Sequence, residues 1–299
     1  QGPLESRMML TEEQVAFYNE HGWLRIPQIF TGEEFRELDA DTESLIQAWT
    51  QEVMGWTGPW RKVYMDADTE ARSKLVVLFE FQLFSAAWTR AVAKPALAEA
   101  ISQLLDTPNV ELQQSTLHAK PPSTGPPFPV HQGYPFYPHT NDRFVDVLVH
   151  LDNTSDVNGE IRFLDGSHKL GPLQHVTSNL DGTPCTPHLP TEEWKLEDTV
   201  AVPAEAGDVL VMNINTIHGS YLNRSDAIRR MVRLGYRDPT NHQLSGQNMD
   251  RTGMMVLGRR PKEDGDSMFR ALFPEQYRKG KAEKEKTEDI KNEVDVAAG

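Results

Sequence analysis

The stretch Val145-Asp146-Val147-Leu148-Val149-His150-Leu151 is an apolar run rich in β-branched residues, and it predicts a buried strand. Similar short runs follow residue 110 and are separated by turn residues: 110–117, 161–164, 209–212 and 231–236. Short strands at this spacing favour a sandwich or a barrel over alternating βαβ units. The sequence therefore predicts a mainly β fold.

The first hundred residues predict helices that flank this core. Thr11 and Gln14 have the spacing of a capping box, in which each side chain bonds to the backbone amide of the other residue. A second helix is expected to begin near Thr31. A third begins at Pro95, because proline suits the first turn of a helix.

The chain is expected to form a single domain over residues 9–275. Its helices would lie in 9–105 and its strand core at about 110–240. Residues 1–8 are interpreted as a remnant of tag cleavage. Residues 278–299 are highly charged and poor in apolar side chains, so they are expected to be disordered.

Composition excludes several classes of partner. The 299 residues carry 44 acidic and 30 basic side chains, a net charge of −14, which argues against a nucleic-acid polymer or an anionic membrane as partner. There is no run of 18 apolar residues that could cross a membrane. Cys185 is the only cysteine, which suits a reducing, cytoplasmic setting. Small anionic ligands remain compatible with this charge.

Two histidines are candidates for a shared metal. His131 and His218 lie 87 positions apart, each at the boundary of a strand pattern. Neutral imidazoles from two strands can converge at the mouth of a barrel and bind a divalent ion. The chain has ten histidines, however, and a hydrogen-bonded structural role is the commoner fate of any one of them.

Arg229 follows His218 by 11 residues, beyond a turn. If the flanking segments are paired strands, Arg229 points back towards the metal, where a guanidinium could clamp a carboxylate. The alternative is a surface charge. Arg230 fits that alternative, because neighbouring strand residues face opposite ways.

The order and spacing of several motifs resemble the phytanoyl-CoA dioxygenase family over roughly residues 10–260. The motifs are Lys120-Pro121-Pro122, His131-Gln132, Asn158-Gly159, Gly166-Ser167-His168-Lys169, Gly207-Asp208, His218-Gly219-Ser220 and Arg229. This resemblance implies a double-stranded β-helix, or jelly roll, with helices packed against it. It also implies an enzyme that uses iron(II), 2-oxoglutarate and O₂.

Site residues are carried over from the resemblance position by position. His131 and His218 match the two histidine ligands of the iron. Arg229 matches the residue that pairs with the far carboxylate of 2-oxoglutarate, and Ser220 matches the hydroxyl beside it. Gln132 falls in the neighbourhood of the cosubstrate.

Gly133 departs from the family pattern. Hydroxylases of the family have an aspartate here, the carboxylate of the 2-His-1-carboxylate triad. In the related halogenases this position is Ala or Gly, and a chloride or bromide ion takes the vacated place on the iron. The resemblance therefore implies a radical halogenase, in which a hydrogen atom is removed from an unactivated C–H bond and the substrate radical recombines with chloride.

Three other interpretations of Gly133 remain open. It could be an engineered replacement of aspartate in a hydroxylase. It could mark a family member that binds a ligand without catalysis. It could also belong to a hydroxylase that works with two histidines and a water. Nothing in the spacing of Asp142, Asp146 or Asp152 indicates that one of them supplies the missing carboxylate.

Candidate substrate-pocket residues are Tyr134, Tyr137 and His150, which are expected to line the approach to the iron. Residues 50–75 look like an irregular insertion, and Trp56 and Trp60 within it are expected to contribute to a lid. Aromatic and basic residues together suit an anionic or heteroaromatic small molecule, such as a nucleotide or an amino-acid derivative.

Overall fold

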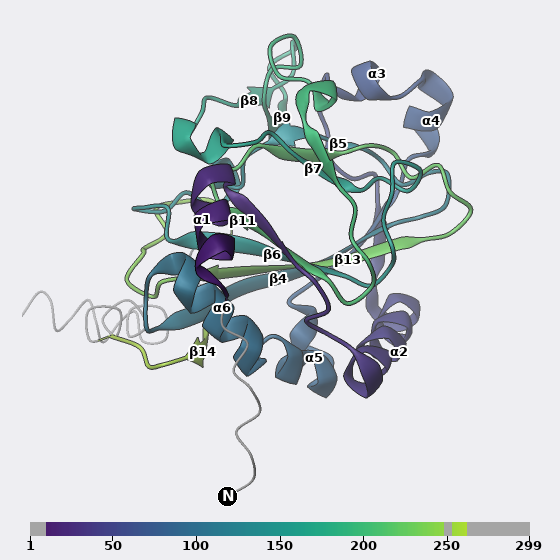
Figure 1. The fold of residues 1–299 in the computed structure, drawn as a ribbon. Helices are drawn as coiled ribbons and strands as arrows, with labels where there is room; N and C mark the ends of the chain where they lie inside the picture. The colour runs from purple at the N-terminus through teal and green to yellow at the C-terminus, as the bar shows by residue number, and fades with distance from the viewer. Residues whose placement is uncertain (1–9, 248–252, 262–299) are drawn as a thin grey trace, which may run out of the picture.

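The computed structural model describes residues 10–247 and 253–261. The predictions for residues 1–8 and 278–299 concern segments outside the described residues. Two antiparallel sheets dominate the described chain, with helices packed around them (Figure 1). The expected strand-rich core with flanking helices is therefore present.

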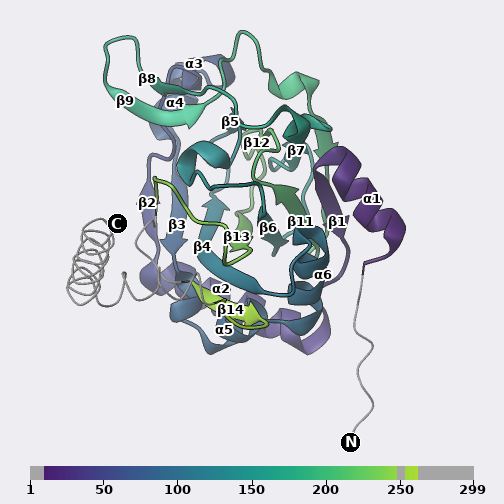
Figure 2. The same cartoon turned by 90° about the vertical axis from the view of Figure 1, so that its left-hand side faces the viewer.

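The larger sheet contains most of the strands and runs the full width of the molecule. In spatial order its strands are β1 (Trp23–Ile26), β11 (Val209–Asn213), β6 (Phe144–His150), β13 (Arg229–Arg237), β4 (Val110–Lys120), β3 (Leu75–Phe79) and β2 (Gln51–Val53), while β14 (Met254–Leu257) also pairs with β4. Figure 2 shows α1 at one edge of this sheet and β2 at the other.

The smaller sheet faces the larger one. Its strands, in order, are β10 (Val200–Val202), β7 (Ile161–Phe163), β12 (His218–Ser220) and β5 (Phe128–His131). A separate hairpin pairs β8 (Val176–Ser178) with β9 (Pro184–His188). Side chains from both sheets share one apolar cluster, in which Leu148 and Met231 meet Ile161 and Phe163.

Helices cover the outer face of the larger sheet. They are α2 (Gly32–Trp49), α5 (Ala86–Ala91) and α6 (Pro95–Leu105) (Figure 1). The helix α1 (Glu12–His21) lies beside the edge strand β1, and the short α3 (Arg61–Tyr64) and α4 (Ala67–Arg72) lie beside the smaller sheet. The capping box at Thr11 and Gln14 is confirmed, as is the first-turn proline of α6. None of the helices among the described residues could cross a membrane, since each is too short or too polar.

Alternation along β6 and β13 decides what points between the sheets. Val145, Val147 and Val149 of β6 pack into the core beneath the helices, so Asp146, Leu148 and His150 face the smaller sheet. On β13, Val232, Leu234 and Tyr236 face the helices. Arg229, Met231 and Arg233 therefore point between the sheets.

The larger sheet extends further than the sequence predicts. Residues 75–79 form β3, which pairs with β4, and residues 51–53 add β2 at its edge. The run Leu75-Val76-Val77-Leu78-Phe79 is apolar and β-branched, which explains its pairing. The segment 50–75 is thus partly regular structure rather than a loose insertion.

Candidate metal and cosubstrate site

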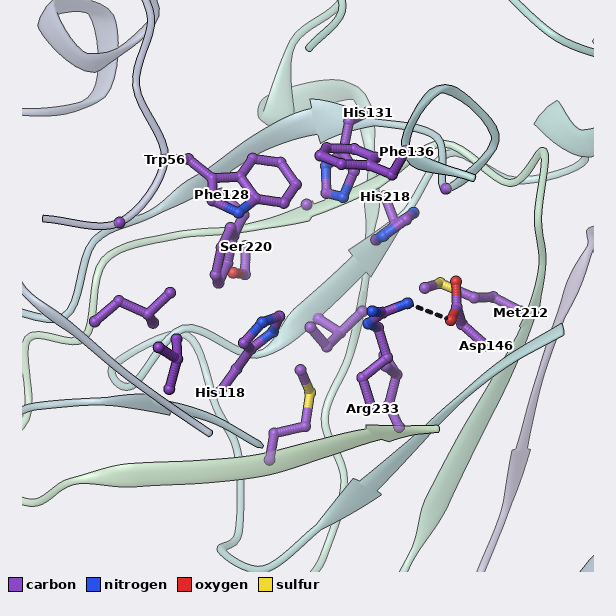
Figure 3. A pocket seen from close by; sticks show the side chains of 18 of the residues that line it. Trp56, His118, Phe128, His131, Phe136, Asp146, Met212, His218, Ser220 and Arg233 are labelled. Atoms are coloured by element: carbon purple, nitrogen blue, oxygen red, sulfur yellow. Dashed lines mark hydrogen bonds and ion pairs between the residues drawn. The ribbon is translucent and has the colours of Figure 1, made fainter. Parts of the chain in front are cut away.

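His131 and His218 are neighbours in the smaller sheet. They lie opposite each other in the pairing of β5 with β12, and their ring centroids are 4.1 Å apart. Figure 3 shows both rings directed into the same space between the sheets. The fold therefore brings together two histidines that are 87 positions apart in the sequence.

Backbone carbonyls fix the orientation of both imidazoles. The Nδ1–H of His131 donates to Pro129 O at 2.8 Å, and that of His218 donates to Thr216 O at 2.9 Å. A carbonyl only accepts, so Nδ1 carries the proton and Nε2 keeps its lone pair. Burial lowers the pKa of both histidines, and the neighbouring His218 adds to the effect at His131. Two neutral imidazoles fixed in this way are suited to binding a divalent metal.

In the described part of the chain, no third protein ligand lies beside them. Among residues 10–247 and 253–261, no group of three His, Cys, Asp or Glu side chains could hold a metal ion. Gly133 has φ −68° and ψ −32°, a right-handed helical conformation that any residue can adopt. Its backbone therefore does not explain why a glycine stands here.

Asp146 approaches Gly133 from β6, but both of its oxygens are engaged. Tyr137 Oη donates to Asp146 Oδ2 at 2.5 Å, and Arg233 Nη1 donates to Asp146 Oδ1 at 2.9 Å. Arg233 Nη1 also lies 3.0 Å from Tyr137 Oη, which closes a three-residue network (Figure 3 shows the link between Arg233 and Asp146). Burial, followed by the carboxylate of Asp146, raises the pKa of Tyr137 well above its usual value. Asp152, another candidate, pairs with Arg230.

A second polar region lies near Ser220 and contains two buried cations. Lys120 of β4 is opposite Arg229 of β13, and its ammonium donates to Ser220 Oγ at 2.7 Å and to Tyr221 O at 2.6 Å. All three guanidinium nitrogens of Arg229 lack a hydrogen-bond partner among the described residues, although this side chain is 1% exposed. His150, in the same region, also has an unpartnered Nε2.

The buried charge of Arg229, unpaired among the described residues, favours the binding of an anion in this region. Burial lowers the pKa of Arg229 to about 10, and burial together with Arg229 lowers the pKa of Lys120 well below its usual value. A buried charge without a partner is expensive in free energy. A ligand carboxylate would satisfy Arg229 with paired hydrogen bonds, so these residues fit the far carboxylate of 2-oxoglutarate.

Gln132 has a different environment from the one expected. Its side-chain amide donates to Gly171 O at 2.9 Å and to Asn215 O at 2.7 Å, and its Oε1 accepts from Leu173 N at 2.8 Å. The side chain is 0% exposed and all its polar atoms are used. Because Gln132 follows His131 in the chain, its side chain leaves on the opposite face. It ties loops together and does not line the cavity that contains both histidines.

A cavity of about 260 Å³ lies between the sheets and includes both histidines. His131, His218 and Ser220 line it from the smaller sheet, and Asp146 and Arg233 line it from the larger one. Its walls are otherwise mostly apolar. Trp56 stands beside His131, with ring centroids 4.4 Å apart, and also contacts Phe128 and Phe136 (Figure 3).

Of the four expected pocket residues, Tyr137 lines this cavity and the other three do not. Tyr134 begins the 3₁₀ turn η2 (Tyr134–Phe136) and borders a separate surface depression. His150 is buried near Arg229. Trp60 is 0% exposed and donates to Thr57 O, so its indole belongs to the core. Trp56, which was expected in the same lid, lines the cavity.

Sequence reasoning gave no role to Lys120, Asp146 or Arg233, and it did not single out His118. A signal was present for two of them. Asp146 and Arg233 are charged residues inside apolar strand runs, on the same face as Leu148 and Met231. A charge in such a position must be paired or functional.

Comparison with known proteins gives one family. The family model described as phytanoyl-CoA dioxygenase matches residues 18–231. The chain is 28% identical over 257 residues to a probable alpha-ketoglutarate-dependent hypophosphite dioxygenase of Stutzerimonas stutzeri, covering 83% of this chain and 86% of that protein. It is 26% identical over 253 residues to an ectoine dioxygenase of Bordetella bronchiseptica, covering 78% and 77%.

Solved structures agree on the fold. The non-heme alpha ketoglutarate dependent carbocyclase SnoK from nogalamycin biosynthesis superposes with a TM-score of 0.63 at 20% identity, covering 80% of this chain and 88% of that one. EctD from S. alaskensis with bound Fe gives a TM-score of 0.60 at 22% identity, covering 79% and 80%. At these identities the likeness supports the fold alone.

Proposed function

The chain belongs to the phytanoyl-CoA dioxygenase family of iron(II)- and 2-oxoglutarate-dependent oxygenases, and from this premise we propose that it modifies an unactivated C–H bond of a small molecule, with radical halogenation as its specific reaction. The two facing sheets are interpreted as the double-stranded β-helix of that family. His131 and His218 are proposed to hold the iron, because their Nε2 atoms point into one cavity and their Nδ1 atoms are fixed by carbonyls.

The cosubstrate is assigned to the region of the two buried cations. Arg229 would pair with the far carboxylate of 2-oxoglutarate, and Ser220 would hold the same end. Lys120 already bonds to Ser220, so it orients that hydroxyl and adds positive charge. This assignment puts the cosubstrate next to the proposed iron ligands, because Ser220 and His218 lie on the same three-residue strand, β12.

The chain's own residues position the reaction and keep water out. Iron, 2-oxoglutarate and O₂ supply the oxidant when bound, and the organic chemistry is theirs. The apolar walls of the cavity, including Met212, Met231 and Trp56, limit the entry of water and hold the target carbon near the metal. The protein thereby decides which C–H bond is presented.

Gly133 is the observation that carries the halogenation proposal. No third carboxylate or histidine joins His131 and His218 in a metal-holding group among the described residues. An anion from solution can therefore take the place that an aspartate has in the 2-His-1-carboxylate arrangement. Chloride or bromide would preserve the charge at the metal. Arg233 is paired to Asp146, which offsets the negative carboxylate that the halide would otherwise face.

Hydroxylation is the second candidate, and two observations favour it. The curated relatives described above are both named dioxygenases. In addition, the carboxylate of Asp146 lies close to position 133, where it could accept a hydrogen bond from a water in the open place on the metal. A family member that binds its ligands without turnover is the third candidate.

The substrate is proposed to be a small molecule with an aromatic or heteroaromatic part. Trp56, Phe128 and Phe136 offer ring faces beside His131. The support for an anionic substrate is weaker, because the cation in this part of the cavity, Arg233, is already paired with Asp146. A nucleotide or an amino-acid derivative would therefore be recognised mainly through its ring.

Anaerobic spectroscopy followed by product analysis tests the proposal. Iron(II) and 2-oxoglutarate should together produce a visible charge-transfer band, and adding chloride should shift it. Absence of both iron binding and the band would rule out the enzyme function. With O₂ and a substrate, succinate and a chlorinated product are expected; an alcohol formed at the same rate without chloride would support hydroxylation instead.

A further inference from the structure

The position that a Cβ atom of residue 133 would take is crowded by Tyr137 and Asp146. An ideal Cβ built on Gly133 would lie 2.7 Å from Tyr137 Oη, 3.1 Å from Asp146 Oδ2 and 3.3 Å from Tyr137 Cζ. A Cβ contact under 3.0 Å requires something to shift. An aspartate carries the same Cβ, so it could not be accommodated without a shift of Tyr137 or Asp146. The neighbours, and not the backbone conformation, therefore require a glycine.

Tyr137 cannot easily move out of the way. Its hydroxyl donates to Asp146 at 2.5 Å and lies 3.0 Å from Arg233 Nη1. Its ring is 4% exposed and packs in one cluster with Phe144 and Ile214. A swing of the ring would break both hydrogen bonds and open a gap in this cluster. The tyrosine is thus fixed at its hydroxyl by hydrogen bonds and at its ring by packing.

Three elements of the fold contribute to this arrangement. Tyr137 follows the turn η2, Asp146 lies on β6, and Arg233 lies on β13. Asp146 and Arg233 form a buried ion pair, with side chains 1% and 14% exposed. The pair holds the tyrosine hydroxyl through Asp146 Oδ2 and Arg233 Nη1. All three residues line the same cavity as His131 and His218.

We propose that Tyr137, fixed by Asp146 and Arg233, is a positioning residue that excludes a side chain from position 133 and so keeps one place on the metal open to an external ligand. The open place on the metal rests on the proposed function, whereas the steric exclusion of a side chain by Tyr137 does not. A glycine surrounded in this way belongs to a site built around it, which supports a native feature over a single engineered replacement of aspartate.

A double-substitution cycle tests the steric part on metal-free protein. Gly133→Ala adds only a Cβ and should lower the melting temperature by roughly 3–8 °C, as overpacking does. Tyr137→Phe removes the oxygen that the Cβ would meet. Adding Gly133→Ala to Tyr137→Phe should therefore cost less than half as much as adding it to the unsubstituted chain.

Tyr134→Phe is the matched control for the cycle. Tyr134 is next to Gly133 in the chain, but it does not line the cavity. Combining Tyr134→Phe with Gly133→Ala should leave the full destabilisation by Gly133→Ala in place. If Tyr134→Phe and Tyr137→Phe reduced this destabilisation equally, a specific role for the Tyr137 hydroxyl would be contradicted. A Gly133→Ala protein as stable as the unsubstituted one would contradict it as well.

Metal binding supplies a readout that a purely structural role would not move. Gly133→Asp alone should not gain a carboxylate ligand, because Tyr137 blocks it. The Gly133→Asp/Tyr137→Phe protein should bind iron(II) about tenfold more tightly than Gly133→Asp. Its charge-transfer band with 2-oxoglutarate should no longer respond to chloride. Tight, chloride-insensitive binding by Gly133→Asp alone would overturn the proposal.

The two kinds of failure are distinguishable. If the unsubstituted chain binds neither iron(II) nor 2-oxoglutarate, the proposed function fails, while the melting-temperature cycle still decides the steric role of Tyr137. If the unsubstituted chain binds both but the cycle shows no relief by Tyr137→Phe, the proposed function stands and the inference about Tyr137 is wrong.

Discussion

Arg229 and Arg233 lie four residues apart on the same face of β13, and their surroundings are opposite. Arg233 donates to Asp146 at 2.9 Å and to Tyr137 at 3.0 Å. Arg229 is 1% exposed, and none of its three guanidinium nitrogens has a partner among the described residues. Arg233 lines the cavity with its charge already paired. Arg229 has no hydrogen-bonded counter-ion among the described residues.

The difference between the two arginines shows that a strand decides the direction of a side chain but not its partners. Alternation along β13 sends both side chains between the sheets. The neighbouring strands decide the rest. β6 supplies a carboxylate near Arg233, whereas β4 supplies a second cation, Lys120, near Arg229. An unpaired buried cation is costly, so its presence points to a ligand that completes it.

Breaking the ion pair between Asp146 and Arg233 should have the largest effect on stability. Asp146→Ala leaves Arg233 buried and uncompensated, which should destabilise the metal-free protein by about 3–5 kcal/mol. The free energy of unfolding in urea measures this loss. Asp146→Asn keeps an acceptor for Tyr137 and should cost less. A loss under about 1 kcal/mol for Asp146→Ala would show that the pair is not part of the folded framework.

Removing Arg229, the cation without a partner among the described residues, should affect the binding of 2-oxoglutarate more than stability. Arg229→Ala should weaken 2-oxoglutarate binding to the iron-loaded protein by about 2–4 kcal/mol, because a buried bidentate ion pair is lost. It should destabilise the metal-free protein less than Asp146→Ala does, since no partner is left unpaired. Anaerobic titration of the charge-transfer band measures the affinity. Unchanged affinity would remove Arg229 from the cosubstrate site.

Much of this architecture could be predicted from the sequence, because the signals were local. Runs such as 145–151 and 209–212 are apolar enough to predict strands, and the pattern at Thr11 predicts a capped helix. The facing of Arg229 and Arg230 on opposite sides of β13 followed from strand alternation. Strands β2 and β3 were not predicted, since the irregular composition around them hid a short apolar run.

The site was less predictable, because its geometry depends on contacts between distant segments. Asp146 was set aside for want of a suitable spacing. The fold nevertheless places its carboxylate 3.1 Å from where a Cβ of residue 133 would lie. Trp60 and Trp56 are both aromatic in the sequence, but in the fold Trp56 lines the cavity while Trp60 is buried with its indole bonded to Thr57 O. Gln132 was expected near the cosubstrate, but strand alternation turns it away from the cavity.

His150 should make the stability of this region depend on pH. It lies opposite Met231, midway between the two arginines. Burial, followed by the charge of Arg229, lowers its pKa to about 4. The unfolded value is near 6.5, so between these values the unfolded state binds more protons and stability falls as the pH falls. From pH 7 to pH 5 this histidine should account for about 2 kcal/mol of lost stability.

Urea unfolding of the His150→Gln protein at both pH values checks this expectation. Its loss of stability between pH 7 and pH 5 should be smaller than that of the unsubstituted chain. The Arg229→Ala protein should lie between the two, because the charge of Arg229 is only part of the cause. Identical losses in all three proteins would place the pH dependence in other histidines.

The smallest effect is expected from Arg230, the residue that separates the two faces of β13. Its guanidinium points to the helix side, where it bonds to Asp152 at 2.6 Å and to Asp39 at 2.9 Å. Both acids are partly exposed, so Arg230→Met should cost about 1 kcal/mol in stability. It should leave 2-oxoglutarate affinity unchanged, since Arg230 faces away from the cavity. If it weakened binding as much as Arg229→Ala, loss of general positive charge would explain both results, and the orientation of Arg229 would explain neither.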